Sequence, residues 1–263
     1  MIPYIGGKSR ISSWVIGNFP KEYEEMTYCE VFGGGGWVLF KKENSRVEIY
    51  NDLNKDLVHL FKVIRYNYEE FHHRSEWVLH SREMYNEARE RLKNDKFLNE
   101  IERGMNYAIN RVQSFSGQGG WGYEISANKE SSGKWYPFLR RLEYINARLK
   151  KVQIECLDFE KVIKKYDRPG TIFYLDPPYL GTEYYYNQSG VKFKHEDHLR
   201  LFEVISSIKG KFLLSYYDNP TIKEMWKNYD MITRKTVKSS FGMSGKQKGS
   251  KRPEAVEMLI RNY

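Results

Sequence analysis

The apolar run Thr171–Leu175 leads directly into the tetrapeptide Asp176-Pro177-Pro178-Tyr179. The run is rich in β-branched and aromatic residues and predicts a buried strand, and the two prolines stop both a helix and a continued strand after Asp176. The tetrapeptide is therefore expected at the carboxyl end of a strand, where ligands bind in open α/β sheets. A carboxylate, fixed carbonyl groups and an aromatic ring suit a planar amine such as adenine. The alternative is a turn that stops the strand, with Asp176 as its cap and Tyr179 packed beneath it.

Composition indicates a globular protein with a basic surface. The 263 residues, 40% hydrophobic and 16% aromatic, can bury a substantial core in one large domain or two unequal ones. The 43 Lys and Arg against 34 Asp and Glu give a net charge of +9, which favours a polyanionic partner. No run approaches ~20 apolar residues, the start lacks a signal-peptide pattern, and the two cysteines make neither a disulfide framework nor a zinc cluster. These features predict a cytoplasmic protein without a membrane segment or a metal.

A glycine run, Gly33–Gly36, follows a second predicted strand, Thr27–Phe32. Trp37–Phe40 predicts the start of a helix after it. Glycine lets the backbone approach a ligand at such a helix start, so the run indicates a nucleotide-binding unit. It is not the dinucleotide fingerprint, because Val38 replaces the third glycine of that motif.

A third predicted strand, Arg46–Tyr50, ends at Asn51 and Asp52. An acidic residue about 20 positions after the glycine turn is placed to bind ribose hydroxyls. The alternative is that Asp52 is the N-cap of a helix starting at Leu53, and Asn51 is a second candidate for that cap.

The segment from residue 54 to 149 interrupts this α/β pattern, since it is long, polar and mostly helical in its periodicity. Within it, residues 114–122 begin a glycine-rich hairpin or loop with aromatic and basic neighbours, which predicts a nucleic-acid probe. Arg111, Trp121 and Lys134 are its candidate DNA contacts. The alternatives are a surface loop with its aromatic residues folded back onto the helices and, for Arg111, a helix-surface ion pair.

The α/β pattern then resumes and ends in a closing antiparallel strand pair. In chain order we expect a helix over 138–149, a strand over 152–156, a helix over 160–165, the strand that ends at Leu175, a helix over 195–208, and strands over 211–215, 231–237 and 255–261. The polar stretch between the last two strands predicts a mobile basic loop. Its candidate phosphate contacts are Lys238, Lys246, Lys248, Lys251 and Arg252.

Two histidines, His195 and His198, lie on one face at the start of a predicted helix. This spacing suits a pair of metal ligands, but the sequence offers no third ligand. Solvated histidines at a helix start are therefore the preferred interpretation.

Taken together, these motifs resemble the DNA adenine methyltransferase (Dam-like) family over nearly the whole chain. The matching motifs are, in chain order, residues 4–8, 30–35, 51–52, 110–111, 158–159, 176–179 and 236–239. The family transfers a methyl group from S-adenosylmethionine to the exocyclic N6 amine of adenine in double-stranded DNA. The resemblance implies a Rossmann-like methyltransferase sheet with helices on both faces, formed by residues 1–53 and 150–263. Residues 54–149 would be the interrupting, mostly helical DNA-recognition domain.

The resemblance also implies a role for each matching residue. Tyr4 and Lys8 would hold the methionine end of the cofactor, with Lys8 neutralising its carboxylate. The other cofactor residues would be Phe32, Gly33 and Gly35 along the glycine loop, Asp52 at the ribose, Asp158 and Phe159 at the adenine, and Asp176 between cofactor and target. Position 4 is more often tryptophan in the family, and residues 112–135 differ from its recognition hairpin, so the target sequence is not implied.

Asp176, Pro177 and Tyr179 are the predicted catalytic residues. The amine of adenine is a poor nucleophile because its lone pair is conjugated with the ring, and hydrogen bonds to the Asp176 carboxylate and the Pro177 carbonyl would favour a more tetrahedral nitrogen. The adenine would be flipped out of the duplex and stacked on Tyr179. The sulfonium leaving group is already activated, so no metal is required.

Two rival functions share some of these residues. A methyltransferase acting on RNA or protein more often has Asn at the position of Asp176 and lacks a large basic insertion. A DNA-binding relative whose activity has decayed is disfavoured by intact Lys8, Asp52 and Asp176. The sequence does not indicate a restriction-enzyme partner, and it leaves the recognised site and the oligomeric state open.

Overall fold

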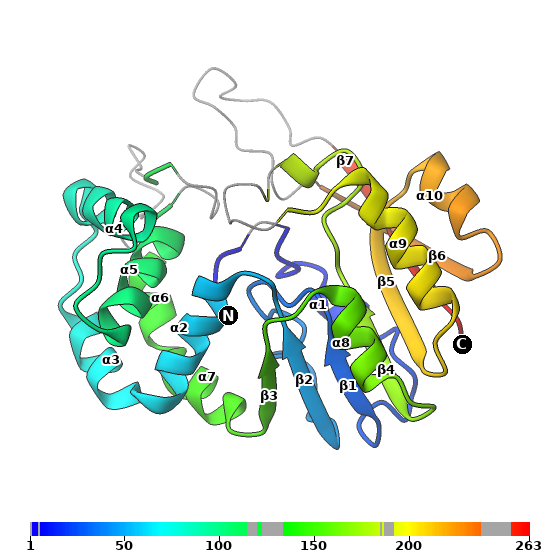
Figure 1. Cartoon of the computed structure of the whole chain (residues 1–263), viewed down its shortest axis with the longest axis horizontal. Coiled ribbons are helices and arrows are strands. Elements are labelled where there is room, and N and C mark those ends of the chain that lie inside the picture. Colours follow the sequence, from blue (N-terminus) through cyan, green and yellow to red (C-terminus); the bar gives the residue numbers. More distant parts are fainter. Residues whose placement is uncertain are drawn as a thin grey trace.

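The computed structural model describes residues 2–4, 6–114, 120–122, 134–184, 186, 192–237 and 254–263. Its centre is a seven-stranded sheet in the order β3-β2-β1-β4-β5-β7-β6 (Figure 1). Every pairing is parallel except those of β7, which runs antiparallel to both neighbours. The strands are β1 (Thr27–Glu30), β2 (Val47–Asn51), β3 (Val152–Glu155), β4 (Thr171–Leu175), β5 (Lys211–Tyr217), β6 (Asp230–Val237) and β7 (Glu254–Arg261). The predicted Rossmann-like α/β fold and its closing antiparallel pair are confirmed.

Alternate residues of the central strands point to opposite faces of the sheet, as strand geometry requires. Both faces carry large apolar side chains, which explains the continuous apolar run of β4. One face is covered by α8 (Phe159–Tyr166), α9 (His195–Ser206) and α10 (Pro220–Met225). The other face is covered by α1 (Ser12–Ile16) and by the helices of the long insertion.

The insertion is mostly helical, as predicted. Its helices are α2 (Lys55–Tyr66), α3 (Tyr68–Glu76), α4 (Arg82–Asn94), α5 (Glu100–Val112), α6 (Trp135–Leu139) and α7 (Leu142–Leu149). Their buried residues form one hydrophobic cluster with Tyr28, Tyr50 and Tyr174 of the sheet. The insertion and the sheet therefore share a core at this face, and the division of the chain into a catalytic and a recognition domain stays a prediction about function.

Near the glycine run one predicted helix start was wrong, and so was the alternative that Asp52 or Asn51 caps the next helix. Residues 37–41 form successive turns instead of a helix, and Lys42 at their end is held against β2 by a buried ion pair with Glu48 (2.5 Å). The helix expected after Asp52 begins at Lys55. Its N-cap is Asn54, whose side-chain oxygen accepts hydrogen bonds from two N–H groups of the first turn, so neither Asp52 nor Asn51 has that role.

The helix predicted over residues 138–149 is divided into α6 and α7. Helix α6 starts at Trp135, before Pro137, because proline is tolerated in the first turn of a helix. Of the described helices, none combines the length and the apolar character that a membrane span requires.

Candidate active site

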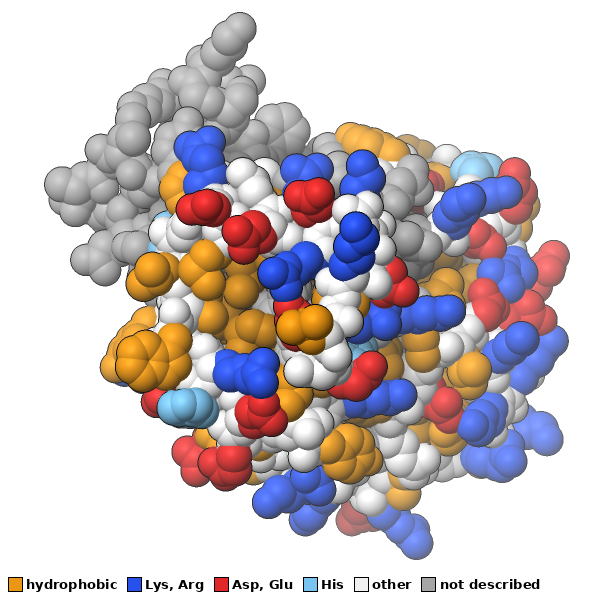
Figure 2. Space-filling view, turned by 60° about the vertical axis from the view of Figure 1, so that its left-hand side comes forward, with side chains coloured by type: hydrophobic (Ala, Val, Ile, Leu, Met, Phe, Trp, Pro, Cys, Tyr) orange, Lys and Arg blue, Asp and Glu red, His pale blue; other side chains and the backbone are white. Residues whose placement is uncertain are grey.

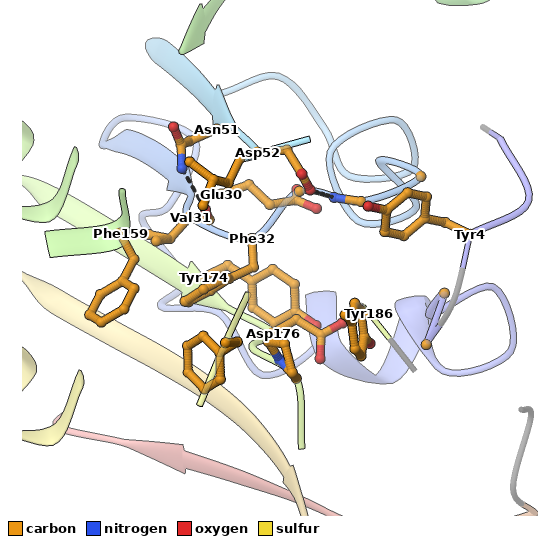
Figure 3. A pocket seen from close by; sticks show the side chains of 18 of the residues that line it. Tyr4, Glu30, Val31, Phe32, Asn51, Asp52, Phe159, Tyr174, Asp176 and Tyr186 are labelled. Atoms are coloured by element: carbon orange, nitrogen blue, oxygen red, sulfur yellow. Dashed lines mark hydrogen bonds between the residues drawn. The ribbon is translucent and has the colours of Figure 1, made fainter. Parts of the chain in front are cut away.

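A pocket opens at the carboxyl ends of β1 to β4, beside the point where the strand order reverses (Figure 3). In open α/β sheets this is the position at which ligands bind. The pocket is partly open to solvent, and its lining combines charged, glycine and aromatic residues. Each residue predicted to bind the cofactor lines it: Tyr4, Lys8, Phe32, Gly33, Gly35, Asp52, Asp158, Phe159 and Asp176.

A buried ion pair between Lys8 and Asp176 lies at one end of the pocket. Lys8 Nζ is 2.7 Å from Asp176 Oδ1, and the side chains are only 6% and 16% exposed. Burial raises the pKa of Asp176, although Lys8 opposes this effect. Burial alone would lower the pKa of Lys8, but the carboxylates of Asp176 and Glu257 outweigh it and raise that pKa. An ammonium beside a carboxylate matches the two charges of a free amino acid.

Asp52, at the end of β2, lies on another side of the pocket. Its Oδ2 accepts the N–H of Gly34 at 2.7 Å, and its Oδ1 accepts the N–H of Asn54 at 2.8 Å. Burial raises the pKa of Asp52 to about 6, against the opposing effects of these two hydrogen bonds and of Arg111. Each carboxylate oxygen has two lone pairs, so this group can also accept hydrogen bonds from a diol.

The glycine turn owes its shape to the protein's own packing. A Cβ atom at Gly33 would lie 2.0 Å from the ring of Tyr50, and one at Gly35 would lie 2.2 Å from the carbonyl oxygen of Ile2. The glycines were predicted for close approach to a ligand, and both positions line the pocket. Glycine is required there even before a ligand is considered, because no side chain fits beside Tyr50 or Ile2.

An aromatic cluster forms the opposite end of the pocket. The rings of Phe32, Phe159 and Phe193 lie 5.7 to 5.9 Å apart. The guanidinium carbon of Arg200 is 4.1 Å from the centroid of the Phe159 ring, and the guanidinium donates to Asp158 at 2.9 and 3.0 Å. Apolar rings with a polar edge suit a purine base.

Sequence reasoning missed several residues of the pocket. Phe193 precedes helix α9 and Arg200 lies within it. The sequence there predicts only a helix and gives no signal that these two side chains line a pocket. Asn51 could have been found from its position next to Asp52. Its side-chain amide donates to the carbonyls of Val31 and Leu157 at 2.9 and 3.0 Å. These hydrogen bonds connect the end of β2 to the segments that follow β1 and β3.

The structure describes only some of the predicted DNA contacts. Arg111 is 7% exposed, and its guanidinium carbon lies 5.7 and 5.1 Å from the ring centroids of Tyr4 and Tyr107, so it is not a helix-surface ion pair. Lys134 is exposed at the start of α6. The loop cations Lys238, Lys246, Lys248, Lys251 and Arg252 lie outside the described residues. A DNA contact by any of these cations stays a prediction.

Trp121 packs against the start of helix α4. Its ring stacks on His80 with centroids 5.1 Å apart and an angle of 26°, and the guanidinium carbon of Arg82 is 4.6 Å from it. The backbone at Ser114 and Trp121 pairs in an antiparallel bridge. Basic and acidic side chains are interspersed on the described surface of the helical insertion (Figure 2).

The interpretation of His198 as a solvated histidine was wrong. Its side chain is buried, with Nδ1 2.7 Å from the Tyr216 hydroxyl and Nε2 2.9 Å from a Glu183 carboxylate oxygen. The rings of Phe193 and Tyr216 pack around it and exclude water. Among the residues that the structure describes, no three His, Cys, Asp or Glu side chains are arranged to hold a metal ion.

The profile of the D12 class N6 adenine-specific DNA methyltransferase family matches residues 4–240. The chain belongs to this family. The D12 enzymes are adenine-specific DNA methyltransferases that use S-adenosylmethionine, and the enzyme class, the cofactor and the DNA substrate predicted from the sequence are thereby confirmed. The pocket fits this cofactor, because its charged pair, buried carboxylate and aromatic end match an amino acid, a ribose and a purine.

Three named proteins are similar to this chain. The type II methyltransferase M.MjaIII of Methanocaldococcus jannaschii is 26% identical over 292 residues, which span 100% of this chain and 98% of the relative. The type II methyltransferase M1.LlaDCHI of Lactococcus lactis is 23% identical over 282 residues, 99% of this chain and 94% of the relative. The DNA N-6-adenine-methyltransferase of Escherichia phage P1 is 25% identical over 240 residues, 85% of this chain and 30% of the relative.

Proposed function

We propose that this D12 methyltransferase flips its target adenine out of the duplex and holds the N6 amine against Asp176 and the carbonyl of Pro177. The observation that carries the proposal is the position of the tetrapeptide between two hollows. Asp176 and Pro178 line the cofactor pocket, whereas Tyr179 lines a second hollow together with Tyr216 and Tyr217. A base that enters the second hollow would meet the cofactor pocket at Asp176.

The cofactor residues divide the pocket by chemistry. Lys8 would face the carboxylate and Asp176 the ammonium of the methionine end, Asp52 would accept the ribose hydroxyls, and the aromatic end would enclose the adenine. The ring of Tyr4 would line the pocket beside the ribose. Its hydroxyl accepts a hydrogen bond from the side chain of Asn54 (3.3 Å), and the backbone N–H of Asn54 donates to Asp52. When bound, S-adenosylmethionine supplies a methyl group already activated by its sulfonium.

The chain's own part in catalysis is to orient the amine and to exclude water. Hydrogen bonds from N6 to the Asp176 carboxylate and the Pro177 carbonyl direct the nitrogen lone pair out of the ring plane. Burial of Asp176 strengthens this interaction, because hydrogen bonds to a charged group are stronger at low local dielectric. Stacking on Tyr179 compensates in part for the base stacking lost when the adenine leaves the duplex.

The experiment that tests this function combines methylation with base flipping. Duplexes carrying every local sequence context are incubated with the protein and labelled S-adenosylmethionine, and N6-methyladenine is mapped by sequencing. The fluorescent base 2-aminopurine is then placed at the mapped adenine, where extrusion should increase its fluorescence. Methylation without that increase would contradict flipping, and absence of N6-methyladenine in every context would contradict the function itself.

A separate prediction concerns the surface that reads the target. Trp121 stacks on His80, contacts Arg82 and pairs with Ser114, so it is our candidate for a base contact. Trp121→Ala should relax discrimination at one base pair by about 1 to 3 kcal/mol, whereas Lys134→Ala should weaken binding to all sequences alike and reduce the salt slope by about one. The measurement is methylation of a library of site variants at several salt concentrations. If Lys134→Ala alters sequence preference and Trp121→Ala does not, the two assignments are reversed.

The remaining expectations are coarser. The named relatives come from an archaeon, a bacterium and a bacteriophage, which supports a place of action in the cytoplasm of a prokaryotic or phage-infected cell. Two of them are type II methyltransferases, but the sequence of this chain does not indicate a restriction-enzyme partner.

A further inference from the structure

A buried carboxylate lies behind the aromatic ring of the Asp-Pro-Pro-Tyr tetrapeptide. Glu257, in the middle of β7, is 7% exposed, and its Oε2 accepts a hydrogen bond from the Tyr179 hydroxyl at 2.8 Å. Strand β7 pairs with β5 so that Glu257 is directly opposite Tyr217. The ring of Tyr217 in turn meets that of Tyr179 at right angles, with centroids 4.6 Å apart and an angle of 81°.

This carboxylate is costly to bury, so its position needs an explanation. Burial raises the pKa of Glu257, and Lys8 and the Tyr179 hydroxyl oppose that effect while Asp176 adds to it. Glu257 and Lys8 do not form an ion pair of the kind that Lys8 makes with Asp176. Its described hydrogen bond therefore goes to the one side chain of the tetrapeptide that carries an aromatic face.

The Tyr179 ring is consequently held at three points. Its hydroxyl is bound to Glu257, its face is 4.7 Å from the ammonium of Lys8, and it contacts Tyr217. Rotation of the ring about its side-chain bonds would break a buried hydrogen bond to a charged group, which is unfavourable because neither partner would be solvated instead. A ring fixed in advance loses less conformational entropy when a base stacks on it.

We propose that Glu257 is a positioning residue for methyl transfer, which holds Tyr179 by its hydroxyl as a preformed stacking surface for the target adenine. The proposal rests on the role proposed above for Tyr179. It accounts for tyrosine at position 179, because a phenylalanine ring would leave the buried carboxylate without its donor. On this proposal strand β7 contributes a side chain that positions the catalytic tetrapeptide.

The test compares variants of Glu257 and Tyr179 with the wild type in single-turnover methylation and in 2-aminopurine fluorescence. Glu257→Leu should lower the rate by about 10- to 100-fold and reduce the fluorescence increase, because Tyr179 loses its anchor. Glu257→Gln should recover most of both signals, since its amide oxygen can accept the same hydrogen bond. Tyr179→Phe should resemble Glu257→Leu, and the double variant should be no worse than Tyr179→Phe alone, because both changes remove one interaction. Glu203→Gln, an exposed position on helix α9, is the matched control and should behave like the wild type.

Two outcomes separate this proposal from the one on which it rests. If Tyr179→Ala loses flipping and methylation while Glu257→Leu and Tyr179→Phe keep both, Tyr179 binds the base and Glu257 does not position it. If Tyr179→Ala itself keeps flipping and methylation, the role of Tyr179 is wrong. Should Glu257→Leu fail to fold, as judged by thermal unfolding, the decision passes to Tyr179→Phe, and wild-type rate and fluorescence in that variant would overturn the proposal.

Discussion

Methyl transfer should fall by about 10²- to 10⁴-fold when Asp176 is replaced by alanine, the usual scale for the loss of a polar catalytic group. The carboxylate is buried beside Lys8 at the boundary between the cofactor pocket and the hollow lined by Tyr179. Its removal leaves the target amine with only the Pro177 carbonyl as an acceptor. The measurement is a single-turnover rate with labelled S-adenosylmethionine at saturating DNA.

Two further variants make the result specific to the carboxylate. Asp176→Asn keeps the shape and one acceptor oxygen, so its rate should lie between those of the alanine variant and the wild type. Asp230→Asn removes a carboxylate that forms an ion pair with Arg261 on the outer strands, and it should leave the rate unchanged. A rate close to that of the wild type in Asp176→Ala would remove Asp176 from the catalytic residues.

Replacing Asp52 with asparagine should weaken binding of S-adenosylmethionine by about 1 to 3 kcal/mol, measured by calorimetry without DNA. The Asp52 carboxylate already accepts two backbone N–H groups, and an amide NH₂ in its place would oppose one of those donors. The same change also removes the negative charge that attracts the ribose hydroxyls. Glu155→Gln, at the partly exposed end of the neighbouring strand β3, is a control that should bind as the wild type does.

The pH dependence of the same measurement provides a second check. Because burial raises the pKa of Asp52 to about 6, protons compete with the ribose for this carboxylate below that pH. The contribution of Asp52 to the affinity should be fully present above about pH 7 and should decrease as pH falls through about 6, at most tenfold per pH unit. This component should be absent in Asp52→Asn. An unchanged affinity and an unchanged pH profile in the variant would assign the ribose to another group.

The parts of the site that the sequence predicted lie where strands end. Asp176 follows a short apolar run and Asp52 follows a predicted strand that alternates in polarity, and a strand that stops at an acidic residue is visible without knowing what surrounds it. The order of the motifs along the chain then supplied the family, and with it the cofactor residues that line the pocket. Strand order itself was not predictable from local patterns, because it depends on which strand ends meet in space.

The residues that were missed depend on that order. Glu257 reaches Tyr179 only because β7 inserts between β5 and β6, and Arg200 reaches Asp158 only because α9 lies beside α8. The helix predicted after the glycine run failed for the same kind of reason. A local apolar pattern suggested it, but the buried ion pair between Lys42 and Glu48 holds the end of this stretch against β2.

The hydrophobic cluster shared by the sheet and the helical insertion bears on how such enzymes acquire new target sequences. Within this cluster the ring of Tyr50 in β2 packs edge-on against Phe61 of α2, so the helical body cannot be exchanged without uncovering part of the catalytic sheet. Trp121, which follows α5 in the chain, is not among the residues of this cluster. Divergence in specificity is therefore expected to concentrate near Trp121, while the insertion helices change only as fast as the core of the sheet permits.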